Sequence, residues 1–125
     1  MSTSVIIKPR ILIADRSEIY LSAVRTMVNG WKDVHVVGTC STTTDLTFML
    51  STLEVDVLII DYIIFGEHTV TGIKNIKTQF PNTKMIVLSF ENMMMTTEAL
   101  IEAEVGKFVS KWDDTSKLLD AINFN

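Results

Sequence analysis

The chain alternates between two patterns of apolar residues. The first is a short, continuous run rich in Ile, Val and Leu, and it occurs at residues 11–14, 55–60 and 85–88. Runs of this length and composition are typical of strands buried on both faces of a parallel sheet. Weaker runs of the same kind lie at residues 34–37 and 107–109. The pattern therefore predicts five strands.

The second pattern is longer and places apolar residues at helical spacing after each strand. The predicted helices are bounded by residues that cap or break helices, namely Ser17 and Asn29–Gly30, Thr43 or Thr44, Pro81–Asn82, Gly106 after residues 93–104, and Thr115 or Ser116. The side chains expected to face the core are Ile19, Tyr20, Ala23, Val24, Met27 and Val28, then Leu46, Met49, Leu50 and Leu53, then Ile73, Ile76, Lys77 and Phe80, and finally Leu118, Leu119 and Ile122.

The order of these elements is strand then helix, repeated five times. Strands that alternate with helices form βαβ units, and right-handed crossovers place the helices on both faces of the sheet. We therefore predict an α/β fold with a five-stranded parallel sheet. Residues 1–9 are predicted to be a flexible N-terminal tail and residues 10–125 a single domain.

Composition agrees with a single globular domain and narrows the class of protein. Of the 125 residues, 47% are apolar and 21% are charged. The formal charge of −4 disfavours nucleic-acid binding by the domain itself, since phosphate contacts need clustered Lys and Arg. Cys40 is the only cysteine, so the chain has no internal disulfide, which fits a cytoplasmic location. No apolar run approaches the length of a membrane span, and no secretory leader is expected at the N-terminus.

Polar residues follow four of the predicted strands. Asp15 ends the first, Asp61 the third, Ser89 the fourth and Lys111 the fifth. Ligands of open parallel sheets bind at the carboxyl ends of the strands, so we expect these side chains to converge. A solvated Asp beside a divalent cation is a nucleophile toward phosphorus, and a hydroxyl and an ammonium can hold phosphoryl oxygens. The set therefore indicates phosphoryl chemistry.

These residues stand in short motifs whose order and spacing resemble the receiver domain of two-component response regulators. The resemblance is greatest to the NarL/FixJ class, and within that class it is greatest to RcsB-like receivers. The stretches that carry it are residues 11–15 (ILIAD), 36–38 (VVG), 56–61 (DVLIID), 80–81 (FP), 85–89 (MIVLS) and 108–111 (FVSK). The resemblance implies a flavodoxin-like (βα)5 fold.

The resemblance also assigns roles at the strand ends. It implies that Asp61 accepts a phosphoryl group from a histidine kinase or phosphotransfer protein. Asp15, Asp61 and the backbone carbonyl of Ile63 are the implied ligands of Mg²⁺. Ser89 and Lys111 are implied to bind the phosphoryl oxygens.

Phe108 matches the aromatic switch residue of the family, which moves when the Ser89 hydroxyl turns toward the acyl phosphate. Through such a movement, the charge added by phosphorylation would alter the surface that the domain presents to partners. A second predicted surface is the run Met93, Met94 and Met95, because methionine adapts to many partners. The alternative for that run is one buried methionine and two exposed by chance.

The sequence departs from the family pattern around the same pocket. Arg16 stands where the family has a second acid, which would weaken Mg²⁺ binding. Arg16 either pairs with Asp15 or Asp61 or points to solvent, and both alternatives stay open. Ile64–Phe65 replaces a Met-Pro pair, and Phe90 replaces a small residue. These departures suggest altered or lost phosphorylation.

Two functions follow from the sequence. The first is a receiver domain of a transcriptional response regulator, whose phosphorylation on Asp61 controls dimerisation and a C-terminal helix-turn-helix output domain. That output domain is expected but does not lie within these residues. The alternative is an atypical, phosphorylation-independent receiver that forms constitutive homodimers or heterodimers because Arg16 replaces an acid.

Neither function makes the domain an enzyme beyond self-catalysed phosphotransfer and dephosphorylation. A flavodoxin-like enzyme is disfavoured because the sequence has no Gly-rich phosphate loop. An adaptor with an inactive pocket is a third alternative.

Overall fold

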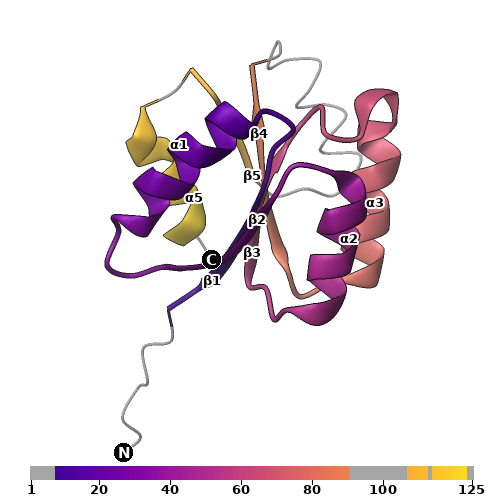
Figure 1. Ribbon diagram of the computed structural model, residues 1–125, viewed down its shortest axis with the longest axis horizontal. Coiled ribbons are helices and arrows are strands. Elements are labelled where there is room, and N and C mark those ends of the chain that lie inside the picture. The colour runs from indigo at the N-terminus through magenta and orange to yellow at the C-terminus, as the bar shows by residue number, and fades with distance from the viewer. Residues whose placement is uncertain (1–7, 91–106, 113, 124–125) are drawn as a thin grey trace, which may run out of the picture.

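The computed structural model describes residues 8–90, 107–112 and 114–123 (Figure 1). Five strands form one parallel sheet in the order β2-β1-β3-β4-β5. Their bounds are β1 Arg10–Ala14, β2 His35–Cys40, β3 Val57–Asp61, β4 Lys84–Ser89 and β5 Lys107–Ser110. All five predicted strands are thus confirmed, each extended or shifted by one to three residues.

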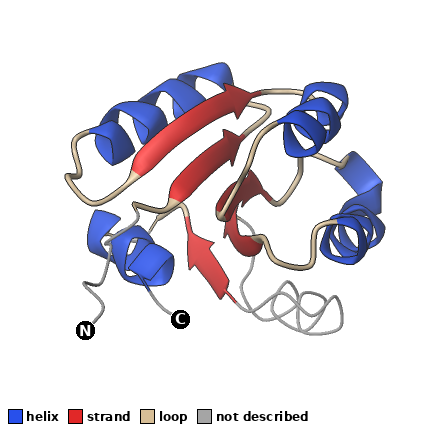
Figure 2. Ribbon diagram, turned by 90° about the horizontal axis from the view of Figure 1, so that it is seen from below, coloured by secondary structure: helices blue, strands red, loops and turns tan. Residues whose placement is uncertain are grey.

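Helices cover both faces of the sheet (Figures 1 and 2). On one face lie α1 (Glu18–Asn29) and α5 (Thr115–Asn123). On the other lie α2 (Thr43–Thr52) and α3 (Thr69–Gln79), with the short 3₁₀ helix η1 (Gly66–His68) leading into α3. The predicted α/β fold is confirmed. The predicted fourth helix, with Met93, Met94 and Met95, lies outside the described residues, as do residues 1–7.

The core has two halves, divided by the sheet. Because successive side chains of a strand point to opposite faces, Ile11 and Ile13 pack toward α1 and α5, whereas Leu12 and Ala14 pack toward α2 and α3. The central strand β3 is buried at every position. This explains why the central strands read as continuous apolar runs.

Ser17 caps α1 as predicted, since its hydroxyl accepts a hydrogen bond from the Tyr20 amide. The cap of α2 differs from the prediction, since Thr42 rather than Thr43 or Thr44 accepts a hydrogen bond from the Asp45 amide. The inward faces of the helices follow the sequence with three corrections. Ile19 and Ala23, however, are exposed, and Ile19 has 87% of its surface accessible. The face of α1 that reaches the sheet is Leu21, Val24 and Val28. Ile19 is two residues from Leu21, which places it on the opposite side of the helix.

Leu53 is the third correction, since it is exposed rather than core-facing. It follows the last residue of α2 and has an extended backbone, so it no longer shares the helical face of Leu46 and Leu50. None of the helices in the described part of the chain combines the length and the hydropathy that a membrane span requires.

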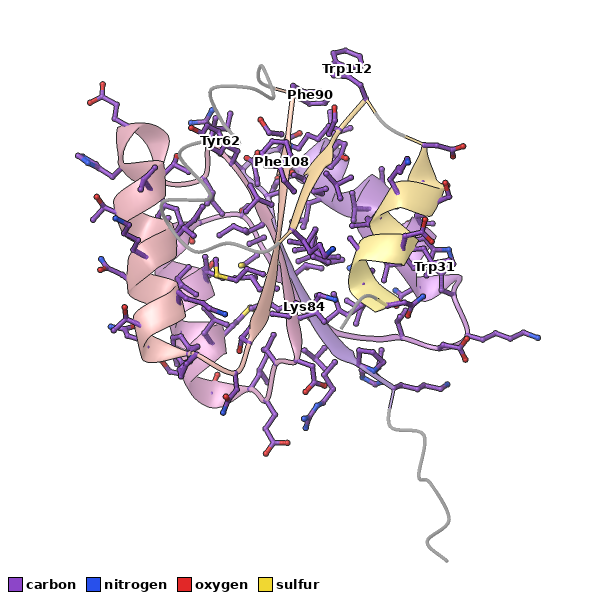
Figure 3. All side chains as sticks on the ribbon, turned by 180° about the vertical axis from the view of Figure 1, so that it is seen from behind. Trp31, Tyr62, Lys84, Phe90, Phe108 and Trp112 are labelled. Carbon is purple, nitrogen blue, oxygen red and sulfur yellow. The ribbon has the colours of Figure 1, made fainter. Side chains whose placement is uncertain are left out.

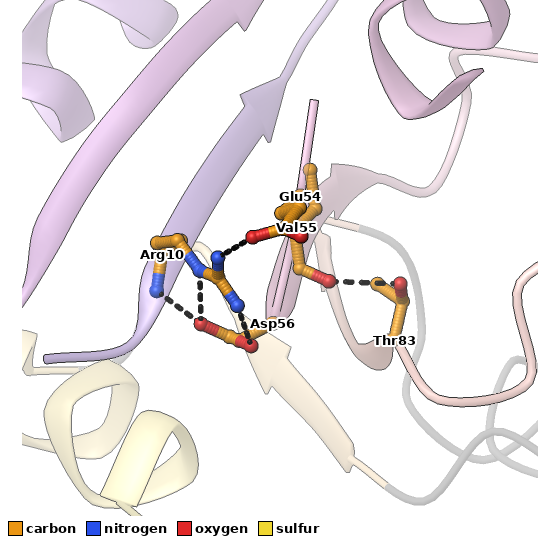
Figure 4. A network of polar contacts seen from close by, with 5 residues as sticks. All are labelled: Arg10, Glu54, Val55, Asp56 and Thr83. Atoms are coloured by element: carbon orange, nitrogen blue, oxygen red, sulfur yellow. Dashed lines mark hydrogen bonds and ion pairs between the residues drawn. The ribbon is translucent and has the colours of Figure 1, made fainter. Parts of the chain in front are cut away.

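An ion-pair cluster ties the amino ends of β1 and β3 together (Figure 4). The Arg10 guanidinium donates to both carboxylate oxygens of Asp56, at 3.0 and 3.1 Å, and also pairs with Glu54. The Arg10 amide donates to the same Asp56 carboxylate at 2.8 Å. The Asp56 backbone bonds on both sides, to Arg10 and to Lys84. Asp56 therefore joins three neighbouring strands on the edge opposite the predicted site.

Asp56→Ala should lower the midpoint of thermal unfolding at neutral pH by about 3–5 °C, because the exposed ion pair is screened but the Arg10 amide also loses its acceptor. The Arg10 hydrogen bond lowers the pKa of Asp56 from its ordinary 3.8. The stabilisation is thus present above pH 3.8 and lost as the pH falls through the lower native value. Differential scanning calorimetry of both proteins should show the difference between their unfolding temperatures shrinking as the pH falls below 3.8. Glu54→Gln is the control, and an equal loss in it would contradict a specific role for Asp56.

Candidate functional site

The strand order brings the predicted site residues to one edge of the sheet. Asp15 directly follows β1, Asp61 ends the neighbouring β3 and Ser89 ends β4. Lys111 follows β5, next to β4, where Ser89 and Ser110 are paired in register. Asp15, Asp61 and Ser89 are buried, with accessible fractions of 2%, 4% and 2%. The expected convergence of these four residues is present.

Lys111 bridges the two carboxylates. Its Nζ donates to Asp15 Oδ2 at 2.8 Å and to Asp61 Oδ1 at 3.1 Å, and all three side chains are at most 4% exposed. Only one of the two negative charges is balanced by this ammonium. Buried like charges of this kind are typical of functional sites, because they cost stability unless something else binds there.

The pKa of the Asp15 carboxyl is raised in this pocket. Burial raises the pKa of its carboxyl, and the charge of Asp61 adds to the rise, although hydrogen bonds from Lys111 and the Ser17 amide oppose it. The Ser17 amide donates to Asp15 Oδ1 at 2.8 Å, so both oxygens of Asp15 have partners. Burial and the same two aspartates raise the pKa of Tyr20 to about 12, which keeps its phenol neutral.

Asp61 differs from Asp15 in one respect. Lys111 contacts its Oδ1, whereas among the described residues nothing donates a hydrogen bond to its Oδ2. A pocket of about 230 Å³ adjoins the carboxylate, and its lining consists of Asp15, Arg16, Ser17, Asp61, Ile63, Ser89, Phe90 and Lys111. One carboxylate oxygen is therefore held by Lys111, and the other has no hydrogen bond from the described residues.

Arg16 lines this pocket but is exposed to solvent. Within the part of the chain that is described, it forms no ion pair with Asp15 or Asp61. Of the two alternatives for Arg16, the structure favours the one in which it points to solvent. The cation that contacts both acids is Lys111 instead.

Two aromatic rings lie beside the Lys111 ammonium and a third packs on one of them, and sequence reasoning did not group the three. Its Nζ is 4.2 Å from the ring centroid of Tyr20 and 5.0 Å from that of Phe90. Trp112 packs against Phe90, and Figure 3 shows these two rings together at the carboxyl ends of the strands. Tyr20 was predicted only as a core residue. Its place three residues after the helix cap Ser17, which follows Asp15, was the available signal.

The loop after β3 is held by hydrogen bonds from the Thr69 hydroxyl and the Gly66 amide. The Thr69 hydroxyl bonds to the carbonyls of Tyr62 and Gly66 at 2.7 and 3.1 Å. Gly66 has a φ of +60°, which a glycine adopts without strain, and its amide donates to the Ile63 carbonyl at 2.9 Å. The Ile63 carbonyl thus has one lone pair engaged and one left for another partner.

The Phe65 ring lies directly against Gly72 of α3. A Cβ built on Gly72 would fall 2.5–2.7 Å from three ring atoms of Phe65. Only glycine allows the ring to lie there. Phe65 and Gly72 together therefore fix the loop that carries Ile63.

Gly72→Ala should destabilise the domain by about 1–3 kcal/mol, although alanine ordinarily favours a helix over glycine. The reason is the overlap of the new methyl group with the Phe65 ring. Urea unfolding of the single variant measures the loss. Phe65→Ala alone and the double variant are the controls, and the added methyl should cost nothing once the ring is gone. A loss that persists in the double variant would show that the ring is not its cause.

Phe108 lies apart from the pocket. It is half-buried on β5, is paired in register with Val87, and packs against the core half beneath α2 and α3. Its predicted role as a switch residue is not tested by this arrangement. The described residues contain no cluster of three or more His, Cys, Asp or Glu side chains, so a cation here would bind between the two aspartates and backbone or water oxygens.

Fold and site together define a doubly wound α/β domain with an acidic pocket at the carboxyl ends of a parallel sheet, closed by one lysine. Comparison with known proteins gives the family. The family model of the response regulator receiver domain matches residues 11–123. The chain therefore belongs to the response regulator receiver domain family.

Curated relatives and solved structures support the same family assignment. The transcriptional regulatory protein RcsB of Salmonella typhi is 33% identical over 104 residues, which is 81% of this chain and 48% of that protein. RcsB of Escherichia coli K12 is 32% identical over the same length and with the same coverage. This chain thus spans about half the length of the curated relatives it matches.

Isolated receiver domains of RcsB have the same fold. The domain from Salmonella enterica serovar Typhimurium, solved with the phosphomimetic BeF3⁻, superposes with a TM-score of 0.85 at 29% identity, covering 93% of this chain and 86% of that one. Its apo form superposes with a TM-score of 0.83 at 30% identity, covering 91% and 84%. The predicted resemblance to RcsB-like receivers is confirmed.

Proposed function

We propose that this receiver domain accepts a phosphoryl group on Asp61 from a histidine kinase or a histidine-containing phosphotransfer protein. The observation that carries the proposal is the asymmetry of the Asp61 carboxylate. One oxygen is paired with Lys111, and the other adjoins the pocket without a hydrogen bond among the described residues. A buried carboxylate held in this way is oriented for in-line attack on phosphorus.

In this mechanism Asp61 Oδ2 attacks the phosphorus of the donor phosphohistidine. A bond forms between that oxygen and phosphorus while the P–N bond breaks, and its electron pair stays on the imidazole nitrogen. Charge accumulates on the three phosphoryl oxygens. Lys111 can shift from the carboxylates toward one of these oxygens, and the Ser89 hydroxyl, at the end of β4, can donate to another.

The donor set fits Mg²⁺, which binds one or two carboxylates and keeps several waters. Asp15, Asp61 and the second lone pair of the Ile63 carbonyl would hold the ion. When bound, it would neutralise charge on the transferred group. Lys111 stands between the two carboxylates, so it must give up at least part of this position. We expect a weak Mg²⁺ affinity for this reason and because Arg16 adds positive charge at the pocket.

The proposal is tested by titrating Mg²⁺ into the protein with and without beryllofluoride, read by Trp112 fluorescence and amide NMR. Saturable Mg²⁺ binding, followed by a further change at Asp61 and Ser89 with beryllofluoride, is the expected result. The absence of any response to either reagent would overturn the proposal. Trp31→Phe assigns the fluorescence change to Trp112, which is exposed and packs on Phe90.

A second candidate function is a phosphorylation-independent receiver that acts as a constitutive homodimer or heterodimer. The observation that favours it is the salt bridge from Lys111 to both acids, since it fills the space between them. Arg16, in place of a second acid, favours it as well. A dimer that is equally abundant with and without beryllofluoride, measured by light scattering, would support this candidate over the first.

For the output, we propose regulated dimerisation coupled to a DNA-binding domain elsewhere in the protein. RcsB has been solved bound to the promoter rprA with BeF3⁻, and as two dimers on two parallel DNAs. The acidic balance of this chain argues that the receiver itself makes no direct contact with nucleic acid. Ser89 and Phe108 are the residues we propose to relay phosphorylation to the dimer surface.

A further inference from the structure

Among the described residues, the Lys111 ammonium has four side-chain neighbours of two kinds. Two are the carboxylates of Asp15 and Asp61, at 2.8 and 3.1 Å. The other two are aromatic rings, those of Tyr20 at 4.2 Å and Phe90 at 5.0 Å from the ring centroids. A cation over an aromatic face within about 6 Å is attracted by the ring quadrupole, and more strongly when it is shielded from water. The Lys111 side chain is 4% exposed, so little solvent screens either attraction.

The rings hold one another in place. Tyr20 and Phe90 meet edge to face, with centroids 5.9 Å apart and planes at 75°. Phe90 in turn packs on Trp112 at 4.9 Å. Phe90 follows Ser89 in the chain, Trp112 follows Lys111, and Tyr20 lies in the first turn of α1. The row of rings therefore connects three of the four segments that carry the site, those of Asp15, Ser89 and Lys111.

Burial of apolar area does not account for this row. Phe90 is 50% exposed and Trp112 is 79% exposed, so neither ring is a core residue. Both positions gain little from the hydrophobic effect compared with a buried side chain. Besides meeting each other, Phe90 and Tyr20 both contact the ammonium.

We propose that Tyr20 and Phe90 are positioning residues for Lys111, and that their rings hold its ammonium between Asp15 and Asp61. In the resting domain this clamp, formed by the rings of Tyr20 and Phe90, keeps the Lys111 ammonium between the two acids, where it competes with a divalent ion. During phosphoryl transfer the same clamp keeps the lysine within reach of the phosphoryl oxygens. The role in transfer rests on the proposed function, whereas the position of the ammonium does not.

The test compares Tyr20→Leu with Tyr20→Phe in the whole chain. Tyr20 does not line the pocket beside Asp61, so its substitution removes no side chain from the wall of that pocket. The first measurement is the NMR signal of the ¹⁵N-labelled Lys111 ammonium, which is visible only when its protons exchange slowly. The second is the Mg²⁺ dissociation constant, and the third is the rate of labelling by acetyl phosphate.

Tyr20→Leu should broaden or abolish the ammonium signal and tighten Mg²⁺ binding by about threefold to tenfold, while slowing phosphoryl uptake. Tyr20→Phe keeps the ring and should behave as the unaltered protein. Opposite changes in Mg²⁺ affinity and transfer rate are not expected from a loss of packing alone. An ammonium signal and a Mg²⁺ affinity unchanged in Tyr20→Leu would overturn the proposal.

Failure of the clamp and failure of the proposed function are distinguishable. If the unaltered protein takes up no phosphoryl group, the proposed function fails, but the ammonium signal still decides whether the rings hold Lys111. If Tyr20→Leu does not fold, Phe90→Leu serves in its place for the ammonium measurement, because Phe90 is half exposed. Phe90→Tyr is then the matched control, and an ammonium signal equal in both variants would overturn the proposal.

Discussion

Asp61→Asn should abolish phosphoryl uptake from acetyl phosphate and from a phosphohistidine donor. An amide lacks the negative charge and the electron pair with which the Asp61 carboxylate would attack phosphorus. Asp15 cannot take over, because both of its oxygens are engaged, one by the Ser17 amide and one by Lys111. We expect a loss of at least about a hundredfold, measured by Phos-tag electrophoresis or intact mass.

The same variant should stay folded, which separates chemistry from stability. Burial first, and then the charge of Asp61, raises the pKa of Asp15, so removing that charge relieves a repulsion in the pocket. We therefore expect Asp61→Asn to unfold at the same temperature as the unaltered domain or higher. Asp114→Asn, on the exposed segment before α5, is a control that should keep full labelling. Labelling that persists in Asp61→Asn would place the acceptor elsewhere.

The sheet could be predicted from the sequence because its inner strands are buried on both faces. Residues 11–14 and 85–88 are apolar at every position, as is typical of a parallel sheet between two helical layers. The helical faces were harder to predict. Ile19 is apolar but 87% exposed, whereas Leu21, at helical spacing from Val24 and Val28, is buried. Apolar residues lie on more than one side of α1, so the pattern alone does not say which side packs on the sheet.

The site was predictable where it depended on topology and not where it depended on side-chain packing. Asp15, Asp61, Ser89 and Lys111 end strands, and parallel strands bring their carboxyl ends together. Whether Arg16 or Lys111 contacts the acids could not be decided by spacing, since both positions adjoin the pocket. The contact of Phe65 with Gly72 and the rings around Lys111 join residues from different elements, and no local pattern reveals them.

Lys111→Met should produce the largest loss of stability of any substitution at the site. It keeps the length and most of the apolar volume of the side chain but leaves Asp15 and Asp61 buried without their shared cation. Removing one partner of a buried ion pair costs about 3–5 kcal/mol. We expect a loss near the lower value at neutral pH, measured by urea unfolding. Lys117→Met, on the exposed side of α5, is the matched control and should be close to neutral.

The cause of that loss can be identified from its pH and Mg²⁺ dependence. Burial raises the pKa of Asp15, and a hydrogen bond from Lys111 opposes the rise, so without Lys111 the pKa should rise further. An acid whose native pKa is raised destabilises the fold above its unfolded value of 3.8, and this penalty disappears as the pH falls. The variant should therefore regain stability relative to the unaltered domain between neutral pH and about pH 4.

Mg²⁺ should restore stability to Lys111→Met more than to the unaltered domain, because it supplies the missing positive charge without having to displace an ammonium. A loss that neither acid nor Mg²⁺ diminishes would mean that Lys111 contributes through packing. In that case the two carboxylates would not be the reason why the lysine is needed. If both restore stability, the pocket is an acidic pair whose resting cation is supplied by the chain itself, and phosphoryl transfer must begin by moving that cation.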